Sequence, residues 1–178
     1  MWQVTESRVA YENAWIRVVE DQVVRPDGTA GVYGVVEVRH PAVFILGLND
    51  ADEVLFETVD RHTVGVSLEI PAGGGDGEDL LVAAKRELYE ETGYVAESWQ
   101  QLGTMWALKG VCRAEQRVFL ARGLSRTSEG DDASAEGILG TTWIPWADVL
   151  RMVTVGEITD GETIGCLVYA AIALGKLS

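Results

Sequence analysis

The apolar and polar positions of the first sixty residues form runs that predict two β-hairpins. Apolar-rich runs at 15–24 and 32–38 flank the sequence Arg-Pro-Asp-Gly at 25–28. Because proline presets φ and glycine accepts a positive φ, this sequence is typical of a tight turn. Runs at 42–48 and 54–58 flank a polar turn in the same way and predict the second hairpin.

The pattern then becomes helical. Residues 66–70 are a short predicted strand that Pro71 ends. Over residues 79–92, apolar side chains recur every four positions, which places them on one face of a helix. Gly93 is a suitable C-terminal stop for that helix.

Strands and helices alternate in the last third of the chain. Three further strands are expected at residues 99–107, 117–121 and 141–144. The polar segment 125–138 is predicted to be a mobile loop. Two helices follow, one over 146–154 and one near Thr159, where Thr159 and Glu162 fit a capping box. This alternation predicts an α/β fold, a layered sandwich with a mixed sheet.

Charge narrows the classes of partner. The chain has 178 residues, enough for a sizeable core, and a formal net charge of −14. Nucleic-acid backbones and anionic membranes both require basic surface, so neither is expected as a partner. An acidic protein that acts on phosphates would need a cation between itself and its substrate.

Targeting signals and cysteine usage indicate a cytoplasmic protein. The first six residues lack the basic start of a signal peptide, and no apolar run approaches the roughly 20 residues of a membrane span. Cys112 and Cys166 are far apart and form no CxxC motif. Free thiols in a reducing compartment are the simplest interpretation, and one disulfide between the two is the alternative.

Three acids on the central predicted helix carry candidate chemistry. Glu87 and Glu91 are four residues apart on one helix face, and Glu90 lies beside them. Like charges at this spacing cost about 0.2–0.5 kcal/mol per pair. Acids in the last helical turn oppose the helix dipole by about 0.3–1 kcal/mol. A bound divalent cation would reverse both signs, and oxygen ligands of this kind suit Mg²⁺ or Mn²⁺.

The segment before this helix is rich in glycine. Residues 71–77 contain four glycines, so backbone groups there can approach a metal ion or a diphosphate closely. Gly73 and Gly74 are therefore candidate substrate-binding residues. The competing interpretation is a solvated acidic helix that follows a flexible turn.

Residues 78–94 resemble the Nudix box, the family pattern G-x5-E-x7-R-E-U-x-E-E-x-G-U in which U is apolar. Glu78 supplies the first acid, and residues 86–94, R-E-L-Y-E-E-T-G-Y, supply the remainder. The loop departs from the pattern, because four residues instead of five separate Gly73 from Glu78 and Ala72 occupies the glycine position. Further segments are similar to the ADP-ribose pyrophosphatase branch of the family, at residues 11–18, 26–28, 69–73 and 156–161.

The resemblance implies an architecture and an assembly. The expected fold is a Nudix-like α/β/α sandwich with a mixed β-sheet, preceded by an N-terminal antiparallel β-hairpin. Residues 1–40 would form that hairpin region and serve dimerisation, and residues 41–178 would form the hydrolase domain. The related enzymes are commonly homodimers with intertwined N-terminal sheets.

The resemblance also assigns a metal site. It implies Mg²⁺ or Mn²⁺ held by Glu87, Glu91 and the backbone carbonyl of Ala72, with Glu90 assisting as ligand or through water. Arg86 would orient the glutamates and pair with Glu78.

The general base is less constrained by the resemblance. Glu115 is the one carboxylate between residues 103 and 124 and is the candidate for this role, the alternative being an ordinary surface glutamate. Other candidate bases lie in the polar segment, at Glu129, Asp131, Asp132 and Glu136.

Substrate contacts each have a structural alternative. Arg61 would contact a phosphate or remain a solvated strand-end residue. Trp15, with Tyr33, would stack on a base at a dimer interface or pack in the core. His62 is expected to be an exposed loop residue.

These features predict an enzyme with a small-molecule substrate. The expected reaction is metal-dependent hydrolysis of a nucleoside diphosphate linked to another group, ADP-ribose or a nucleotide-sugar, to a nucleoside monophosphate and a sugar phosphate. A non-catalytic Nudix-fold module that binds a nucleotide-sugar is the alternative. The complete glutamate set favours the enzyme. The short loop and the lack of any proline between Pro71 and Pro145, where many ADP-ribose hydrolases carry one, favour the alternative.

Overall fold

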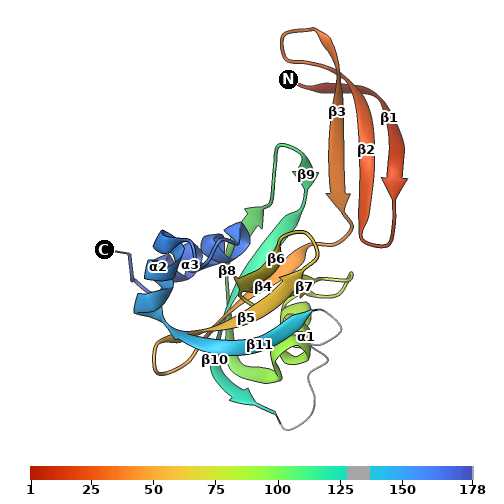
Figure 1. The fold of residues 1–178 in the computed structure, drawn as a ribbon. Coiled ribbons are helices and arrows are strands. Elements are labelled where there is room, and N and C mark those ends of the chain that lie inside the picture. The colour runs from red at the N-terminus through yellow and green to blue at the C-terminus, as the bar shows by residue number, and fades with distance from the viewer. Residues whose placement is uncertain (128–136, 178) are drawn as a thin grey trace.

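The computed structural model describes residues 1–127 and 137–177, and two β-sheets organise this part of the chain (Figure 1). The N-terminal sheet projects away from the body as an arm. It contains β1 (Gln3–Glu12), β2 (Ile16–Val24) and β3 (Ala30–Val38), which are antiparallel neighbours, and β9 (Cys112–Arg113), which pairs parallel to β3. The predicted first hairpin is β2 and β3, and β1 and β9 extend it to four strands.

The second sheet is mixed and forms the body of the molecule. Its strand order is β11-β5-β4-β10-β8, with β6 paired to β5 and β7 paired to β4. The pairing of β10 with β4 is parallel and the other pairings are antiparallel. The strands are β4 (Ala42–Leu48), β5 (Glu53–Arg61), β6 (Gly65–Glu69), β7 (Ala72–Gly74), β8 (Tyr94–Trp106), β10 (Glu115–Arg126) and β11 (Ile138–Pro145).

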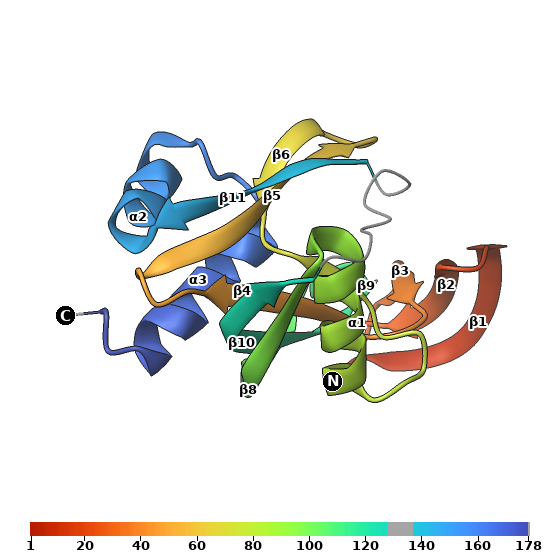
Figure 2. The same ribbon diagram turned by 90° about the horizontal axis from the view of Figure 1, so that it is seen from below.

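Helices cover both faces of this sheet (Figures 1 and 2). On one face α1 (Leu80–Thr92) packs over a cluster that includes Ile45, Leu88 and Phe119. On the other face α2 (Trp146–Val155) and α3 (Gly161–Ala173) enclose a larger cluster that includes Phe56. The expected α/β/α sandwich with a mixed sheet and N-terminal strands is confirmed.

Helix α1 begins and ends as the sequence predicts. The side chain of Asp79 caps the N-terminus by accepting hydrogen bonds from the backbone of Leu81 at 3.0 Å and of Val82 at 3.2 Å. Gly93 ends the helix with φ of 69°, in the left-handed region that favours glycine, and its N–H donates to the carbonyl of Tyr89.

The predicted start of the last helix is wrong by one residue. Asp160, and not Thr159, is the N-terminal cap, and its carboxylate accepts a 2.7 Å hydrogen bond from the N–H of Thr163. Aspartate ranks above threonine as a cap, so the better of two adjacent candidates is used. The hydroxyl of Thr163, in the first turn of α3, accepts a hydrogen bond from the N–H of Ile70 at 3.2 Å. This bond ties α3 to the segment that precedes β7.

Three further expectations concern the polar loop, the two cysteines and membrane-spanning helices. Strands β10 and β11 take up both ends of the predicted loop at 125–138, and residues 128–136 lie outside the described part of the chain. Cys112 and Cys166 are free, so the disulfide alternative is wrong, and burial raises the pKa of the Cys166 thiol. No helix in the described ranges is long and apolar enough to cross a membrane.

Candidate functional site

The site is built where strand β7 meets helix α1. Glu87 and Glu91 lie on the buried face of the helix, and each is only 4% exposed. The N–H of Ala72 donates to the carboxylate of Glu91 at 2.9 Å. A Cβ added at Gly73 would lie 2.1 Å from the carboxyl carbon of Glu87, so the missing side chain leaves the room that this carboxylate occupies. Two acidic groups are thus held against the backbone of one short strand.

Backbone hydrogen bonds to β4 and to the residue before it hold the glycine-rich segment in place. In β7, Gly74 pairs with Ala42 and Gly73 with Val43 of β4. Beyond the strand, the N–H of Gly75 donates to the carbonyl of Pro41 at 2.8 Å. Part of the predicted flexible loop is therefore a strand, and this regularity sets its distance from α1.

Arg86 binds several groups around this strand. Its Nε donates to Glu78 at 2.9 Å, the pairing that the family resemblance implies. Its Nη1 lies 2.9 Å from Glu87 and 3.0 Å from Glu90, and its Nη2 donates to the carbonyl of Gly74 at 3.0 Å. Partial burial opposes the charged guanidinium, but the hydrogen bonds to Glu78 and Glu90 and the charge of Glu87 outweigh it and raise the pKa of Arg86.

The donor set fits a hard divalent cation. Glu87 and Glu91 offer carboxylate oxygens beside the side-chain-free Gly73, and Mg²⁺ and Mn²⁺ prefer oxygen ligands. Glu90 is 45% exposed at its side chain and is bound to Arg86. Within residues 1–127 and 137–177, no three Asp, Glu, His or Cys side chains are gathered closely enough to hold a metal ion. Glu90 therefore does not stand with the other two as a ready third ligand, although Arg86 contacts both Glu87 and Glu90.

Two further acids border the site, and the sequence interpretation missed both. Glu57 is 1% exposed on β5, and it pairs in register with Glu69 of β6. The guanidinium of Arg61 binds the carboxylate of Glu69 at 2.8 Å. Hydrogen bonding to Glu69 raises the pKa of Arg61 although partial burial opposes it, and the charges of Glu91 and Glu57 also raise it. Arg61 is thus paired with Glu69, while its side chain remains 41% exposed at the end of β5. An acid inside the apolar run 54–59 was the available signal for Glu57.

Glu115 begins strand β10 on the same side of the sheet as α1. Its neighbour Gln116 faces α3, where its amide lies 3.4 Å from Glu162, and side chains alternate across a strand. In register, Gln116 aligns with Ala42 and Ala42 with Gly74, so about 10 Å separates the start of β10 from β7 across two strand spacings. The candidate base therefore lies at the start of a strand two places away from β7, the strand that contacts the glutamates.

The other candidate residues are dispersed. Trp15 is 75% exposed in the turn between β1 and β2, so the alternative of core packing is wrong. Tyr33 stacks edge-on against Trp2, with ring centroids 5.3 Å apart. His62 is exposed in the turn between β5 and β6, as predicted. The alternative bases lie outside the described residues, namely Glu129, Asp131, Asp132 and Glu136.

Comparison with known families matches nearly the whole chain in two parts. Residues 2–36 match the nucleoside diphosphate sugar hydrolase N-terminal domain, and residues 38–164 match the NUDIX domain. The boundary between the two matches falls at the end of β3, where the arm joins the body.

Individual relatives are also similar to this chain. The chain is 33% identical to an ADP-ribose pyrophosphatase of Mycobacterium tuberculosis, over 98% of this chain and 86% of the relative. It is 31% identical to a GDP-mannose pyrophosphatase of Yersinia enterocolitica, over 64% of this chain and 60% of the relative. Among solved structures, an ADP compounds hydrolase superposes with a TM-score of 0.85 at 20% identity, over 98% of this chain and 95% of the other, which demonstrates a shared fold.

Proposed function

The chain belongs to the NUDIX family, and from this premise we propose that it hydrolyses the diphosphate of a nucleoside diphosphate linked to another group. The products are a nucleoside monophosphate and a sugar phosphate. The observation that carries the proposal is the pair of buried carboxylates, Glu87 and Glu91, held against the side-chain-free Gly73. Burying two acids in a chain of net charge −14 is unfavourable unless a cation accompanies them.

We propose that the cation is Mg²⁺ or Mn²⁺, held by Glu87, Glu91 and the carbonyl of Ala72, with Glu90 as the assisting acid. When bound, a divalent cation neutralises charge on a diphosphate and lowers the pKa of water. Arg86 positions the carboxylates through its contacts with Glu87 and Glu90.

Proton transfer is assigned to Glu115. A water oxygen forms a bond to one phosphorus while the bond from that phosphorus to the bridging oxygen breaks, and the proton of the water passes to the Glu115 carboxylate. Arg61, half-buried at the end of β5, and the backbone of Gly73 and Gly74 are the proposed contacts for the phosphates.

ADP-ribose is the first substrate to test, and nucleotide-sugars such as GDP-mannose are the second. Relatives named for both substrates support this order, since the match to the ADP-ribose pyrophosphatase covers more of this chain.

We propose a cytoplasmic homodimer as the working form. Residues 1–40 would be the dimerisation region and residues 41–178 the hydrolase domain. All ten residues of β1 are exposed, as are Trp15 and the sheet edge that β1 leaves open, which supports a second copy as partner. The two free thiols support a reducing compartment.

The proposal predicts metal-dependent turnover. With Mg²⁺ or Mn²⁺, the protein is expected to convert ADP-ribose to AMP and ribose 5-phosphate, measured by chromatography beside GDP-mannose, dinucleoside polyphosphates and nucleoside triphosphates. EDTA is expected to abolish the activity, and restored metal to recover it. Tight binding of a diphosphate without turnover of any would instead identify a non-catalytic binding module.

Glu115→Gln is expected to lower kcat by about 10²-fold or more with little change in KM, the usual contribution of a general base. The matched control is Arg117→Gln, because Arg117 is the ion-pair partner of Glu115 and its loss breaks the same contact while the carboxylate remains. Steady-state kinetics of both variants decide the role. An equal loss in the two variants would make the ion pair, and not proton transfer, the reason.

A further inference from the structure

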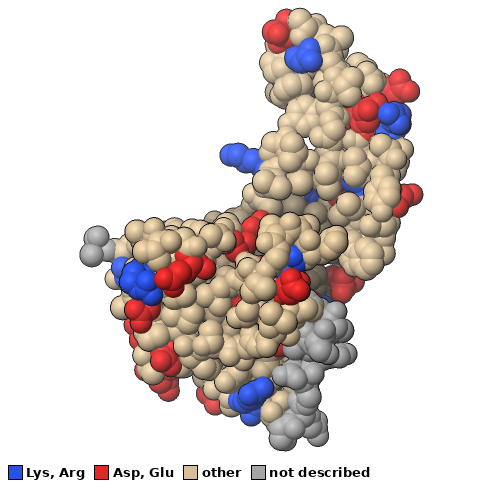
Figure 3. All heavy atoms as spheres, viewed as in Figure 1, with Lys and Arg blue, Asp and Glu red and all other residues tan. Residues whose placement is uncertain are grey.

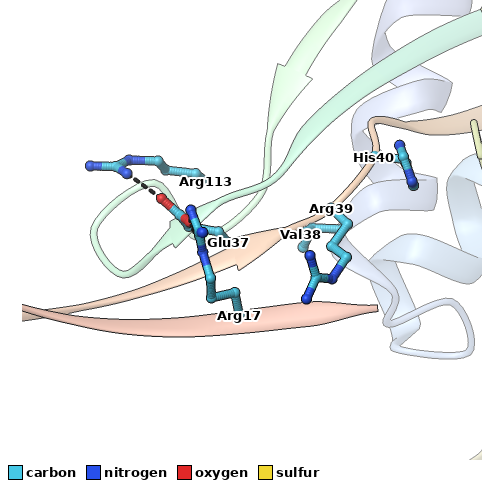
Figure 4. A pocket seen from close by; sticks show the side chains of 6 residues that line it. All are labelled: Arg17, Glu37, Val38, Arg39, His40 and Arg113. Carbon is cyan, nitrogen blue, oxygen red and sulfur yellow. Dashed lines mark hydrogen bonds and ion pairs between the residues drawn. The ribbon is translucent and has the colours of Figure 1, made fainter. Parts of the chain in front are cut away.

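A hollow lies at the junction of the arm and the body (Figure 4). Its volume is about 460 Å³, and it contains none of the glutamates of the candidate metal site. It is lined by Arg17, Glu37, Val38, Arg39, His40 and Arg113. These residues come from β2, β3, the segment after β3, and β9, so the pocket exists only because β9 joins the N-terminal sheet.

The pocket is basic in a strongly acidic chain. Three of the 14 Lys and Arg residues line it, against one of the 28 Asp and Glu residues. With His40 neutral, its lining therefore carries a formal charge of +2, whereas the chain as a whole carries −14. Figure 3 shows how acidic side chains are spread over one face of the molecule. A local reversal of sign of this kind selects an anion.

The three guanidinium groups all make contacts with neighbouring groups of the protein. Arg17 and Arg113 hold Glu37 from opposite sides, and the hydrogen bond from Arg17, followed by that from Arg113, keeps the pKa of Glu37 below its ordinary value. Arg39 donates to the carbonyl of Asn13 at 2.8 Å and to Glu12 at 3.1 Å.

Donor groups remain available on all three arginines. Each guanidinium carries five N–H donors on three nitrogens, and contacts with the described residues use one or two of those nitrogens. In the single chain the side chains of Arg17, Arg39 and Arg113 are 45%, 38% and 60% exposed, so the remaining N–H groups can reach a ligand. Arg17 and Arg39 belong to the proposed dimerisation region, so the site requires a dimer in which the partner copy leaves this junction open.

The pocket adjoins the glycine-rich segment. The Cε1 atom of His40 lies 3.7 Å from the position that a Cβ would take at Gly77, the residue before Glu78. The next residue, Pro41, accepts the 2.8 Å hydrogen bond from Gly75. A molecule bound at the glutamates therefore has this basic hollow beside it.

We propose that the pocket formed by Arg17, Arg39 and Arg113 is a binding site for a single phosphate group that is distinct from the diphosphate to be cleaved. The planar fork of arginine matches phosphate oxygens in a bidentate geometry. The net charge of the chain disfavours a polyanion such as nucleic acid, and three arginines around one hollow of about 460 Å³ suit a single phosphate group. The phosphate comes either from a substrate that carries a further phosphate ester besides the cleaved diphosphate, in which case the proposal rests on the proposed function, or from free inorganic phosphate.

Binding of inorganic phosphate to the metal-free full chain is the first measurement, by isothermal titration calorimetry in a buffer without other anions. Arg39→Gln and Arg113→Gln are each expected to weaken binding about tenfold, because each removes one charged donor. The control is Arg151→Gln, which removes an arginine of similar exposure that is paired with Glu157 on the body, outside this pocket. Circular dichroism and the melting temperature check that the variants fold.

The second measurement separates the two sources of phosphate. Turnover of ADP-ribose is compared with turnover of its adenosine 2′-phosphate derivative. If the substrate carries the phosphate, the two arginine variants lower the ratio of kcat/KM for the phosphorylated to the plain compound about tenfold, and Arg151→Gln leaves the ratio unchanged. An unchanged ratio with arginine-dependent phosphate binding assigns the site to free phosphate.

Phosphate binding that is absent, or equal in all variants, would overturn the proposal. Because the calorimetry needs no turnover, it tests phosphate binding by this pocket even in an inactive protein. Inactivity would contradict only the proposed hydrolase function.

Discussion

Glu91→Gln is expected to lower kcat/KM for ADP-ribose in saturating Mg²⁺ by about 10²–10⁴-fold. A cation contributes several kcal/mol of charge stabilisation to such a reaction, and each 1.36 kcal/mol is a factor of ten in rate, so about 3–5 kcal/mol gives this range. The amide oxygen of glutamine can still accept the hydrogen bond from Ala72, so the fold of β7 and α1 is retained while one negative charge is lost. Steady-state kinetics over a metal titration measure the effect.

Thermal unfolding provides a readout that does not depend on catalysis. A cation at a hundred times its Kd stabilises the protein by about 2.7 kcal/mol. For a chain of this size that corresponds to a rise in Tm of about 5–10 °C, which Glu91→Gln should lose.

Glu97→Gln is the matched control for this variant, because it makes the same chemical change at an exposed position on β8 and should retain both the activity and the Tm rise. Undiminished turnover in the Glu91 variant would remove Glu91 from the metal site.

Gly73→Ala is expected to reduce kcat about 10²-fold, with a cost of about 1–3 kcal/mol in the free energy of unfolding, as for an overpacked site. The added Cβ would lie 2.1 Å from the Cδ of Glu87 and 2.3 Å from its Oε1, so the carboxylate must move. The end of the Glu87 side chain moves more easily than the hydrogen-bonded backbones of β7 and β4. The substitution is therefore expected to displace the carboxylate while the fold is retained. Kinetics and chemical denaturation of the same preparation measure the two effects separately.

Gly140→Ala is the control for the glycine substitution. Gly140 also lies in a strand, β11, and a Cβ there meets nothing within 4 Å. It should retain full activity and equal or greater stability, since alanine restricts the unfolded chain. Wild-type kcat in Gly73→Ala would contradict the close placement of Glu87 against β7.

The elements with a regular burial pattern were predictable from the sequence. Helix α1 follows its apolar spacing, and its cap at Asp79 and its stop at Gly93 both carry local signals. Strand β1 was not predicted, because all ten of its residues are exposed and no face of it alternates between buried and exposed.

The site was predictable where its residues are neighbours in one helix. Glu87 and Glu91 share a face by helical spacing alone. The pairing of Arg61 with Glu69 depends on the register of two strands, and the meeting of Arg113 with Glu37, 76 residues apart, depends on β9 joining β3. Neither the register nor the added strand has a local sequence signal, so this part of the site required the structure.

The β9 strand also determines the order in which the chain can fold. Strands β1 to β3 leave the ribosome first, but their fourth neighbour lies in the connection between β8 and β10, more than 70 residues later. Closing a loop of that length has an entropic cost that local hairpins avoid. The N-terminal arm can therefore form early as three strands, but it reaches its final four-stranded form only after the connection between β8 and β10 has been synthesised, so the first sheet to begin folding waits for a late part of the chain.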